Sequence, residues 1–213
     1  MKEATLPICF AQWPTVFPVR PALVVVPPAD LPAVQETLSP EALEENGPLM
    51  MMALPRDWRS PGRAVADVSE IGLLFRIDLK IETGDIVQLF VRGRRRALIR
   101  SIDATGDCTR ARVGILEPDA PLGEPAAALL RSWIDLRRDE LQQCIDFYDR
   151  HNREPFGPLP SLDAPDGGLV DCLAQLFEPA LDAGGDAHTR LLEELDPDRR
   201  ALLLVQTVDA RIS

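Results

Sequence analysis

Residues 68–102 read VSEIGLLFRIDLKIETGDIVQLFVRGRRRALIRSI. Two apolar runs, Ile71–Ile77 and Ile86–Val91, lie on either side of the turn signal Glu82–Asp85. Gly84 within that signal can adopt a positive φ at little steric cost, so the chain can reverse direction there. The second run alternates in part, which is typical of a strand that is covered on both faces over part of its length. The stretch therefore predicts a long β-hairpin.

The second arm of this hairpin is interrupted at Gly93, where we expect a bulge or a close backbone approach. A basic cluster surrounds this glycine and consists of Arg92, Arg94, Arg95, Arg96 and Arg100. One interpretation is a charged edge strand that is protected from edge-to-edge pairing. The other is an anion or nucleic-acid patch. We favour the first, because no aromatic residues are interleaved with the arginines and the whole chain is acidic.

The acidic charge is unevenly distributed along the 213 residues, which carry a net charge of −11. Residues 1–120 hold 14 Lys and Arg against 16 Asp and Glu, a balance of −2, whereas residues 121–213 hold 9 against 18, a balance of −9. An acidic surface repels phosphate backbones, which argues against general nucleic-acid binding. The length allows one large domain or two small ones.

The N-terminus and the cysteines indicate a cytoplasmic protein without disulfides. Prolines at positions 7, 14 and 18 interrupt the apolar residues near the N-terminus, so neither a signal peptide nor a transmembrane helix is expected. The four cysteines are Cys9, Cys108, Cys144 and Cys172, and no two have the CxxC spacing of a zinc site. Buried thiols that act as small hydrophobes are the favoured interpretation.

Short apolar runs bounded by Pro and Gly predict roughly six strands within residues 1–120. Besides the two strands of the hairpin, the first of which is expected to start at residues 64–68, they are residues 5–10, 22–26, 49–54 and 110–116. One helix or a helical pair is expected after the N-cap Asp30, with Ser39-Pro40 as a second start and Asn46-Gly47 as the end. This pattern suits a small barrel or half-open barrel.

Helical periodicity replaces the strand pattern in residues 121–213. From Glu124 to about His151 the apolar stripe, which includes Trp133, fits one long helix or two. Further helices are expected at residues 169–177, at 188–195 and from Pro197 onward, after the N-cap Asp196. The chain is therefore predicted to be α+β, with a β-rich subdomain at 1–120 and a helical subdomain at 121–213.

The sequence excludes several kinds of catalytic site. Its two lysines, Lys2 and Lys80, follow no glycine-rich loop, so no GxxxxGK[ST] phosphate cradle exists, and neither lies in the context of a Ser–Lys dyad. No serine lies in a GxSxG motif, and the two histidines, His151 and His188, are far apart in the sequence. The sequence does not exclude a catalytic site built on a pair of carboxylates, but a solvated acidic face explains the abundance of Asp and Glu better. We expect no catalytic residues, no metal and no cofactor.

Candidate substrate contacts are the aromatic residues in proline-rich connections. Trp13, Phe17 and Trp58 lie in such connections, where they either cover the core of the small barrel or grip extended apolar peptide. Met51, within the run Met50–Met52, is adaptable apolar surface that either packs in the core or lines a groove.

Four segments, in this order and spacing, resemble a known family. They are the opening Leu6-Pro7-Ile8 through Val16-Phe17-Pro18 to Pro21–Val25, the strand Val68–Leu74, the hairpin segment Gly84–Ala97, and Leu191–Arg200 with its Leu-Leu-Glu, Asp and Arg. Together they are similar to the N-terminal substrate-binding (LON) domain of Lon-type ATP-dependent proteases, which also occurs as a stand-alone protein and in the receptor cereblon. The chain departs from the family pattern at Phe10–Trp13, His188-Thr189 and Ala201, which affects details of the surface.

The resemblance implies a PUA-like β pseudo-barrel with one helix, followed by a helical bundle subdomain. It also implies a non-catalytic module for protein quality control and proteolysis. Its partners would be unfolded or damaged protein substrates and Lon-type ATPase and protease modules, and it would be either a stand-alone protein or the front of a longer protease. Because PUA-like barrels also bind RNA, a nucleic-acid-binding protein is the alternative, which the arginine cluster supports and the net charge opposes.

Overall fold

The computed structural model divides the chain into two units, a barrel unit (residues 1–117) and a helical unit (residues 118–213). The structure describes residues 1–10, 21–45, 47–56, 65–151, 165–177 and 186–212. The division falls between Glu117 and Pro118, slightly before the boundary predicted between residues 120 and 121.

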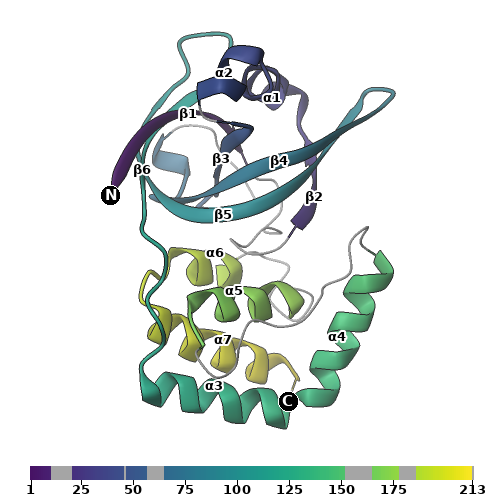
Figure 1. Cartoon of the computed structure of the whole chain (residues 1–213), viewed down its shortest axis with the longest axis vertical. Coiled ribbons are helices and arrows are strands. Elements are labelled where there is room, and N and C mark those ends of the chain that lie inside the picture. Colours follow the sequence, from purple (N-terminus) through teal and green to yellow (C-terminus); the bar gives the residue numbers. More distant parts are fainter. Residues whose placement is uncertain (11–20, 46, 57–64, 152–164, 178–185, 213) are drawn as a thin grey trace. The chain divides into compact units, whose positions relative to one another are not determined.

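The described part of the barrel unit is built on a six-stranded mixed sheet (Figure 1). Its strands are β1 (Lys2–Phe10), β2 (Pro21–Val26), β3 (Leu49–Ala53), β4 (Ile71–Thr83), β5 (Ile86–Asp103) and β6 (Arg110–Ile115). The strand order is β2-β5-β4-β3-β1-β6, and β6 also pairs with β5. Five strands therefore close into a ring, β5-β4-β3-β1-β6, as the prediction of a small barrel requires.

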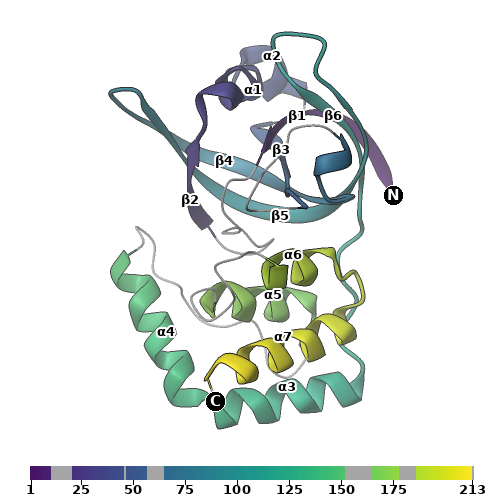
Figure 2. The same ribbon diagram turned by 180° about the vertical axis from the view of Figure 1, so that it is seen from behind.

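The hairpin of β4 and β5 runs through the whole barrel unit (Figure 2). Gly84, with φ of 59°, and Asp85 form a two-residue turn between the paired residues Thr83 and Ile86. A positive φ at the first central residue alone is the pattern of a type II′ turn, whose twist matches that of the strands. The first half of β5 pairs with β2 and its second half pairs with β6. The hairpin thus belongs to the barrel at one end and to a three-stranded extension at the other.

The ladder between β4 and β5 shifts at Gly93, where the sequence predicts a bulge. Leu74 pairs with Arg95 and Phe75 pairs with Gly93, so Arg94 is an extra residue on β5. An extra residue bends its strand and changes the direction of nearby side chains.

The interpretation of the arginine cluster as an edge strand does not hold for β5 as a whole. β5 has β4 on one side, and on the other side it pairs with β2 up to Arg92 and with β6 from Ala97 onward, so residues 93–95 lie between these two pairings. Arg96 is buried, and Nε of Arg92 lies 3.2 Å from Oδ2 of Asp78. Arg94 and Arg95 are exposed. The cluster is therefore divided among different environments.

Two helices, α1 (Leu31–Thr37) and α2 (Pro40–Glu45), follow the short 3-10 helix η1 (Pro28–Asp30). Ser39 caps α2 as predicted, because its Oγ accepts a hydrogen bond from the Ala42 amide at 3.2 Å. Asp30 makes no side-chain cap for α1, which corrects that prediction. Its Oδ2 instead accepts a hydrogen bond from the Phe10 amide at 3.1 Å, and its side chain is buried. Asp30 thus ties the start of the helices to the end of β1.

The barrel core is largely aliphatic and is supplied by every strand of the ring. Its buried members are Leu6, Ile8, Phe10, Met51, Ala53, Val68, Leu74, Ala97, Ile99, Ala111 and Val113. The 3-10 helix η2 (Val65–Asp67) precedes β4 in the chain.

The described helices of the helical unit are α3 (Glu124–Leu136), α4 (Arg138–His151), α5 (Gly167–Leu176), α6 (Asp186–Glu193) and α7 (Pro197–Ile212). The segment from Glu124 to His151, for which the sequence left one or two helices open, is two helices. Nearly every side chain of α5 is buried, so α5 is the central helix of this unit (Figure 1). Trp133 is a core residue as predicted, and its ring centroid lies 5.2 Å from that of Phe177.

We expect Gly84→Ala to lower the free energy of unfolding by about 1 kcal/mol, because an L side chain at positive φ is strained. Gly84→Asn should also destabilise, since Asn tolerates positive φ mainly in the left-handed helical region and not at the first central position of a type II′ turn. Urea denaturation checks both variants. Gly106→Ala, at another turn of the barrel unit with no close neighbour for the added Cβ, is the control. Equal stability of the Gly84 and Gly106 alanine variants would contradict the proposed strain.

Candidate functional site

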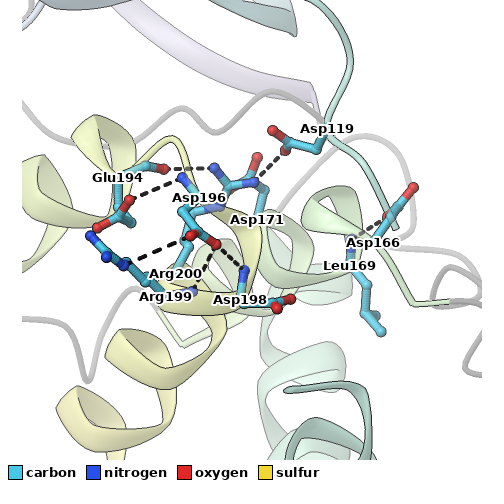
Figure 3. A network of polar contacts seen from close by, with 9 residues as sticks. All are labelled: Asp119, Asp166, Leu169, Asp171, Glu194, Asp196, Asp198, Arg199 and Arg200. Carbon is cyan, nitrogen blue, oxygen red and sulfur yellow. Dashed lines mark hydrogen bonds and ion pairs between the residues drawn. The ribbon is translucent and has the colours of Figure 1, made fainter. Parts of the chain in front are cut away.

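A buried charge network occupies the helical unit around Arg200 (Figure 3). The Arg200 side chain is fully buried, and its Nη1 donates to the Glu194 carbonyl at 2.8 Å. Its Nη2 binds Oδ2 of Asp119, and its Nε lies 3.3 Å from Oδ1 of the buried Asp171. Gly167 makes room for this arrangement, because a Cβ at that position would collide with both Arg200 and Asp119. The guanidinium of Arg200, which belongs to α7, therefore joins this helix to three other segments. They are the first residues of the unit, α5, and the residue that follows α6.

The start of α7 beside this network follows the local signal in the sequence. Oδ1 of Asp196 accepts hydrogen bonds from the amides of Asp198 at 2.9 Å and Arg199 at 3.3 Å, so Asp196 is the N-cap that was predicted. Pro197 occupies the first helical position, where its missing N–H costs nothing. This cap directs Arg200 inward. Because the Arg200 side chain has no solvent access and its two carboxylates already hold it, the network stabilises the helical unit and does not form a reaction site.

We expect Arg200→Ala to lower the free energy of unfolding of the helical unit by about 3–5 kcal/mol, because it leaves buried carboxylates without their cation. The neighbouring Arg199 is the control. Its side chain is 76% exposed and lies 3.7 Å from Asp196, so Arg199→Ala should change stability by less than about 1 kcal/mol. Urea denaturation followed by circular dichroism measures both. If Arg200→Ala lowered the free energy of unfolding as little as the control does, the network would not be needed for the stability of the helical unit.

The described residues contain neither a group of metal ligands nor, at Cys108, an activated thiol. No three His, Cys, Asp or Glu side chains in those residues are placed to hold a metal ion. Burial raises the pKa of the Cys108 thiol to about 12, and a hydrogen bond to Glu36 and its charge add to this effect. That thiol is protonated at neutral pH and is a poor nucleophile.

A continuous apolar surface lies on the three-stranded extension formed by β2, β5 and β4. Leu23 pairs with Phe90, and Phe90 pairs with Leu79, so these three side chains form one row across the strands. In the next row Val25 and Ile81 flank Gln88. Ile86 follows on the same face, since side chains alternate along a strand. We call the set Leu23, Val25, Leu79, Ile81, Ile86 and Phe90 the apolar sheet face.

Four members of the apolar sheet face are about half exposed, at 47% for Leu23, 53% for Val25, 45% for Leu79 and 54% for Ile86, whereas Phe90 between Leu23 and Leu79 is buried. The opposite side of β5 carries Val87, Leu89 and Val91, which are buried. The extension therefore has apolar side chains on both sides, and one of these sides is open to solvent. Contiguous exposed apolar surface of this kind marks interaction sites in soluble proteins.

The predicted substrate contacts have different outcomes. Trp13, Phe17 and Trp58 lie outside the described residues. Met51 is fully buried in the barrel core, so it does not line a surface groove, which corrects its place among the candidate contacts. Sequence reasoning missed the apolar sheet face. The alternation within residues 86–91 was visible, but the rows exist only through the register of three strands.

Comparison with solved structures identifies the fold. The N-terminal domain of Lon protease from the Mycobacterium avium complex matches with a TM-score of 0.67 and 17% sequence identity, over 97% of this chain and 98% of that chain. A Lon N-terminal domain protein from Xanthomonas campestris matches with a TM-score of 0.59 and 18% identity, over 95% of this chain and 98% of that chain. No family model matches the sequence, and no curated protein matches it either.

The chain therefore has the α+β fold of the Lon protease N-terminal domain, which confirms the fold that the resemblance implied. Across the described residues, no helix combines the length and the apolar composition needed to cross a membrane.

Proposed function

We propose that this chain is a non-catalytic substrate-recognition module of the cytoplasm that binds exposed apolar segments of unfolded or damaged proteins. We further propose that it works together with Lon-type ATPase and protease modules, either in the same chain or as a partner. The observation that carries the proposal is the apolar sheet face, which offers half-exposed aliphatic side chains on three paired strands. The fold shared with Lon N-terminal domains supports it.

The chemistry of the apolar sheet face suits an unfolded polypeptide. Aliphatic side chains bind without directional requirements, so sequences that differ can be accepted as long as they expose apolar groups. Gln88, in the second row between Val25 and Ile81, is the one polar side chain of the two rows. Neither row contains a charged side chain. A folded protein, whose apolar residues are mostly inside, would present little to this surface.

Replacing two members of the apolar sheet face tests the proposal directly. We expect the double variant Val25→Thr/Ile86→Thr to bind an unfolded model protein about tenfold more weakly, because apolar area is lost from the contact. Threonine keeps the preference for a strand, so the fold should persist. Fluorescence anisotropy with a labelled, permanently unfolded protein and its folded form measures the affinity.

The matched control is Leu43→Gln/Leu129→Gln, which removes two exposed leucines that belong to the helices α2 and α3 and not to a strand. It should leave the affinity within about twofold of the unchanged protein. If the unchanged protein binds the folded and unfolded forms equally, or if both double variants weaken binding alike, the proposed site is wrong.

Trp13, Phe17 and Trp58 are proposed as further substrate contacts. Trp58→Ala should weaken binding of the unfolded protein severalfold, since aromatic anchors carry much of the energy at interfaces. Phe147→Ala, which removes a 51% exposed aromatic side chain from α4, is the control. Unchanged affinity in the Trp58 variant would remove this residue from the site.

A further inference from the structure

One mouth of the barrel carries a groove that is separate from the apolar sheet face. The start of β1, the start of β3 and the end of β6 meet at this mouth, because β1 runs parallel to β3 and antiparallel to β6. The register brings Leu49 of β3 next to Arg76 of β4, and Leu74 of β4 next to Arg95 of β5. Residues from all five strands of the ring line this groove, whose volume is about 540 Å³. Mouths of β-barrels are common ligand sites, and this volume is typical of them.

The floor of the groove is aliphatic. Leu49, Leu74, Ile115 and Leu116 line it together with Pro48. Leu74 belongs to the barrel core, and Leu49 and Ile115 pack against that core. The groove therefore opens onto the edge of the hydrophobic core, and an apolar group that entered it would continue the packing.

The rim of the groove is basic, in contrast to the acidic chain as a whole. Lys2, Arg76, Arg94 and Arg95 line it, against one acidic residue, Glu117. In a regular strand the consecutive residues Arg94 and Arg95 would point to opposite sides. The bulge at Arg94 removes that alternation, so both arginines border the same groove.

Three of these cations have no partner within the described part of the chain. Arg76 is bound by Asp78 at 2.5 Å, and Glu117 lies 3.7 Å from the N-terminal amine of Met1. The side chains of Lys2, Arg94 and Arg95 make neither a hydrogen bond nor an ion pair with the described residues. By contrast, two exposed arginines of β6 are paired, Arg112 with Glu3 at 2.6 Å and Arg110 with Glu36 at 2.8 Å. An unpaired cationic rim around an apolar floor is complementary to a ligand that is both anionic and apolar.

We propose that the barrel mouth binds an acidic segment of a polypeptide in which large aliphatic side chains are flanked by Asp or Glu. The aliphatic side chains occupy the floor of Leu49, Leu74 and Ile115, and the flanking carboxylates bind Lys2, Arg94 and Arg95. A nucleic acid fits less well, because none of the described residues that line the groove is aromatic and could stack on a base. The inference rests on the proposed function in that the ligand is a protein segment, but it assigns that segment to a different surface.

Labelled short peptides test the proposal on the whole chain by fluorescence anisotropy at low and moderate salt. One peptide carries a Leu-Leu pair flanked by Asp and Glu, the second has Asn and Gln as flanks, the third has Lys and Arg, and the fourth replaces Leu-Leu by Ser-Ser with acidic flanks. The acidic Leu-Leu peptide should bind about tenfold or more tightly than each of the other three, and its affinity should fall as salt rises.

The variant Arg94→Gln/Arg95→Gln should reduce the affinity for the acidic Leu-Leu peptide about tenfold, because it removes two charges from the rim. The control Arg110→Gln/Arg112→Gln removes the same charge from exposed arginines of β6 outside the groove, and should reduce it less than about threefold. Thermal unfolding of each variant establishes that it is folded.

Three results would overturn the proposal. They are equal binding of the acidic and basic peptides, equal effects of the two arginine pairs, and displacement of the acidic peptide by a single-stranded oligonucleotide that itself binds more tightly. Failure here is separable from failure of the proposed function. Val25→Thr/Ile86→Thr should leave binding of the acidic peptide unchanged, and Arg94→Gln/Arg95→Gln should leave binding of a neutral unfolded protein unchanged.

Discussion

The pairing of β5 is the constraint on which the barrel unit depends. This strand pairs with β4 from Ile86 to Leu98, with β2 from Val87 to Arg92 and with β6 from Ala97 to Asp103. Because most of the strand has partners on both sides, most of its backbone groups are satisfied within the unit. The bulge at Arg94 bends β5 between its two halves, which allows one strand to serve a closed ring and an open extension. Both proposed binding surfaces result from this division.

The helical unit is held together by different means. Its apolar core surrounds α5, and Arg200 adds a charged contact that joins segments far apart in the sequence. A buried guanidinium is unfavourable unless its partners are close, which explains why Gly167 leaves space for it beside Asp119. Such a network contributes specificity of packing, because no other cation in that position would reach the same oxygens.

The two surfaces of the barrel unit differ in what they can select. The apolar sheet face is open and apolar, so in the proposed role it would distinguish unfolded from folded proteins and little else. The barrel mouth adds charge at Lys2, Arg94 and Arg95, and charge selects among sequences and depends on salt. Together they would let one small domain combine tolerant capture with a preference for acidic segments.

Local features could be read from the sequence because their causes lie within a few residues. Gly84 permits a turn of positive φ, Ser39 and Asp196 cap helices, and the stripe containing Trp133 follows helical spacing. The fold was predicted from the four segments that resemble the Lon N-terminal domain in the same order. The tertiary structure alone decided that β5 is an interior strand, that Asp30 binds the Phe10 amide instead of its own helix, and that the rows of the apolar sheet face and the cations of the barrel mouth come together. Those features depend on which strands become neighbours and in which register, and that is set by packing across many residues.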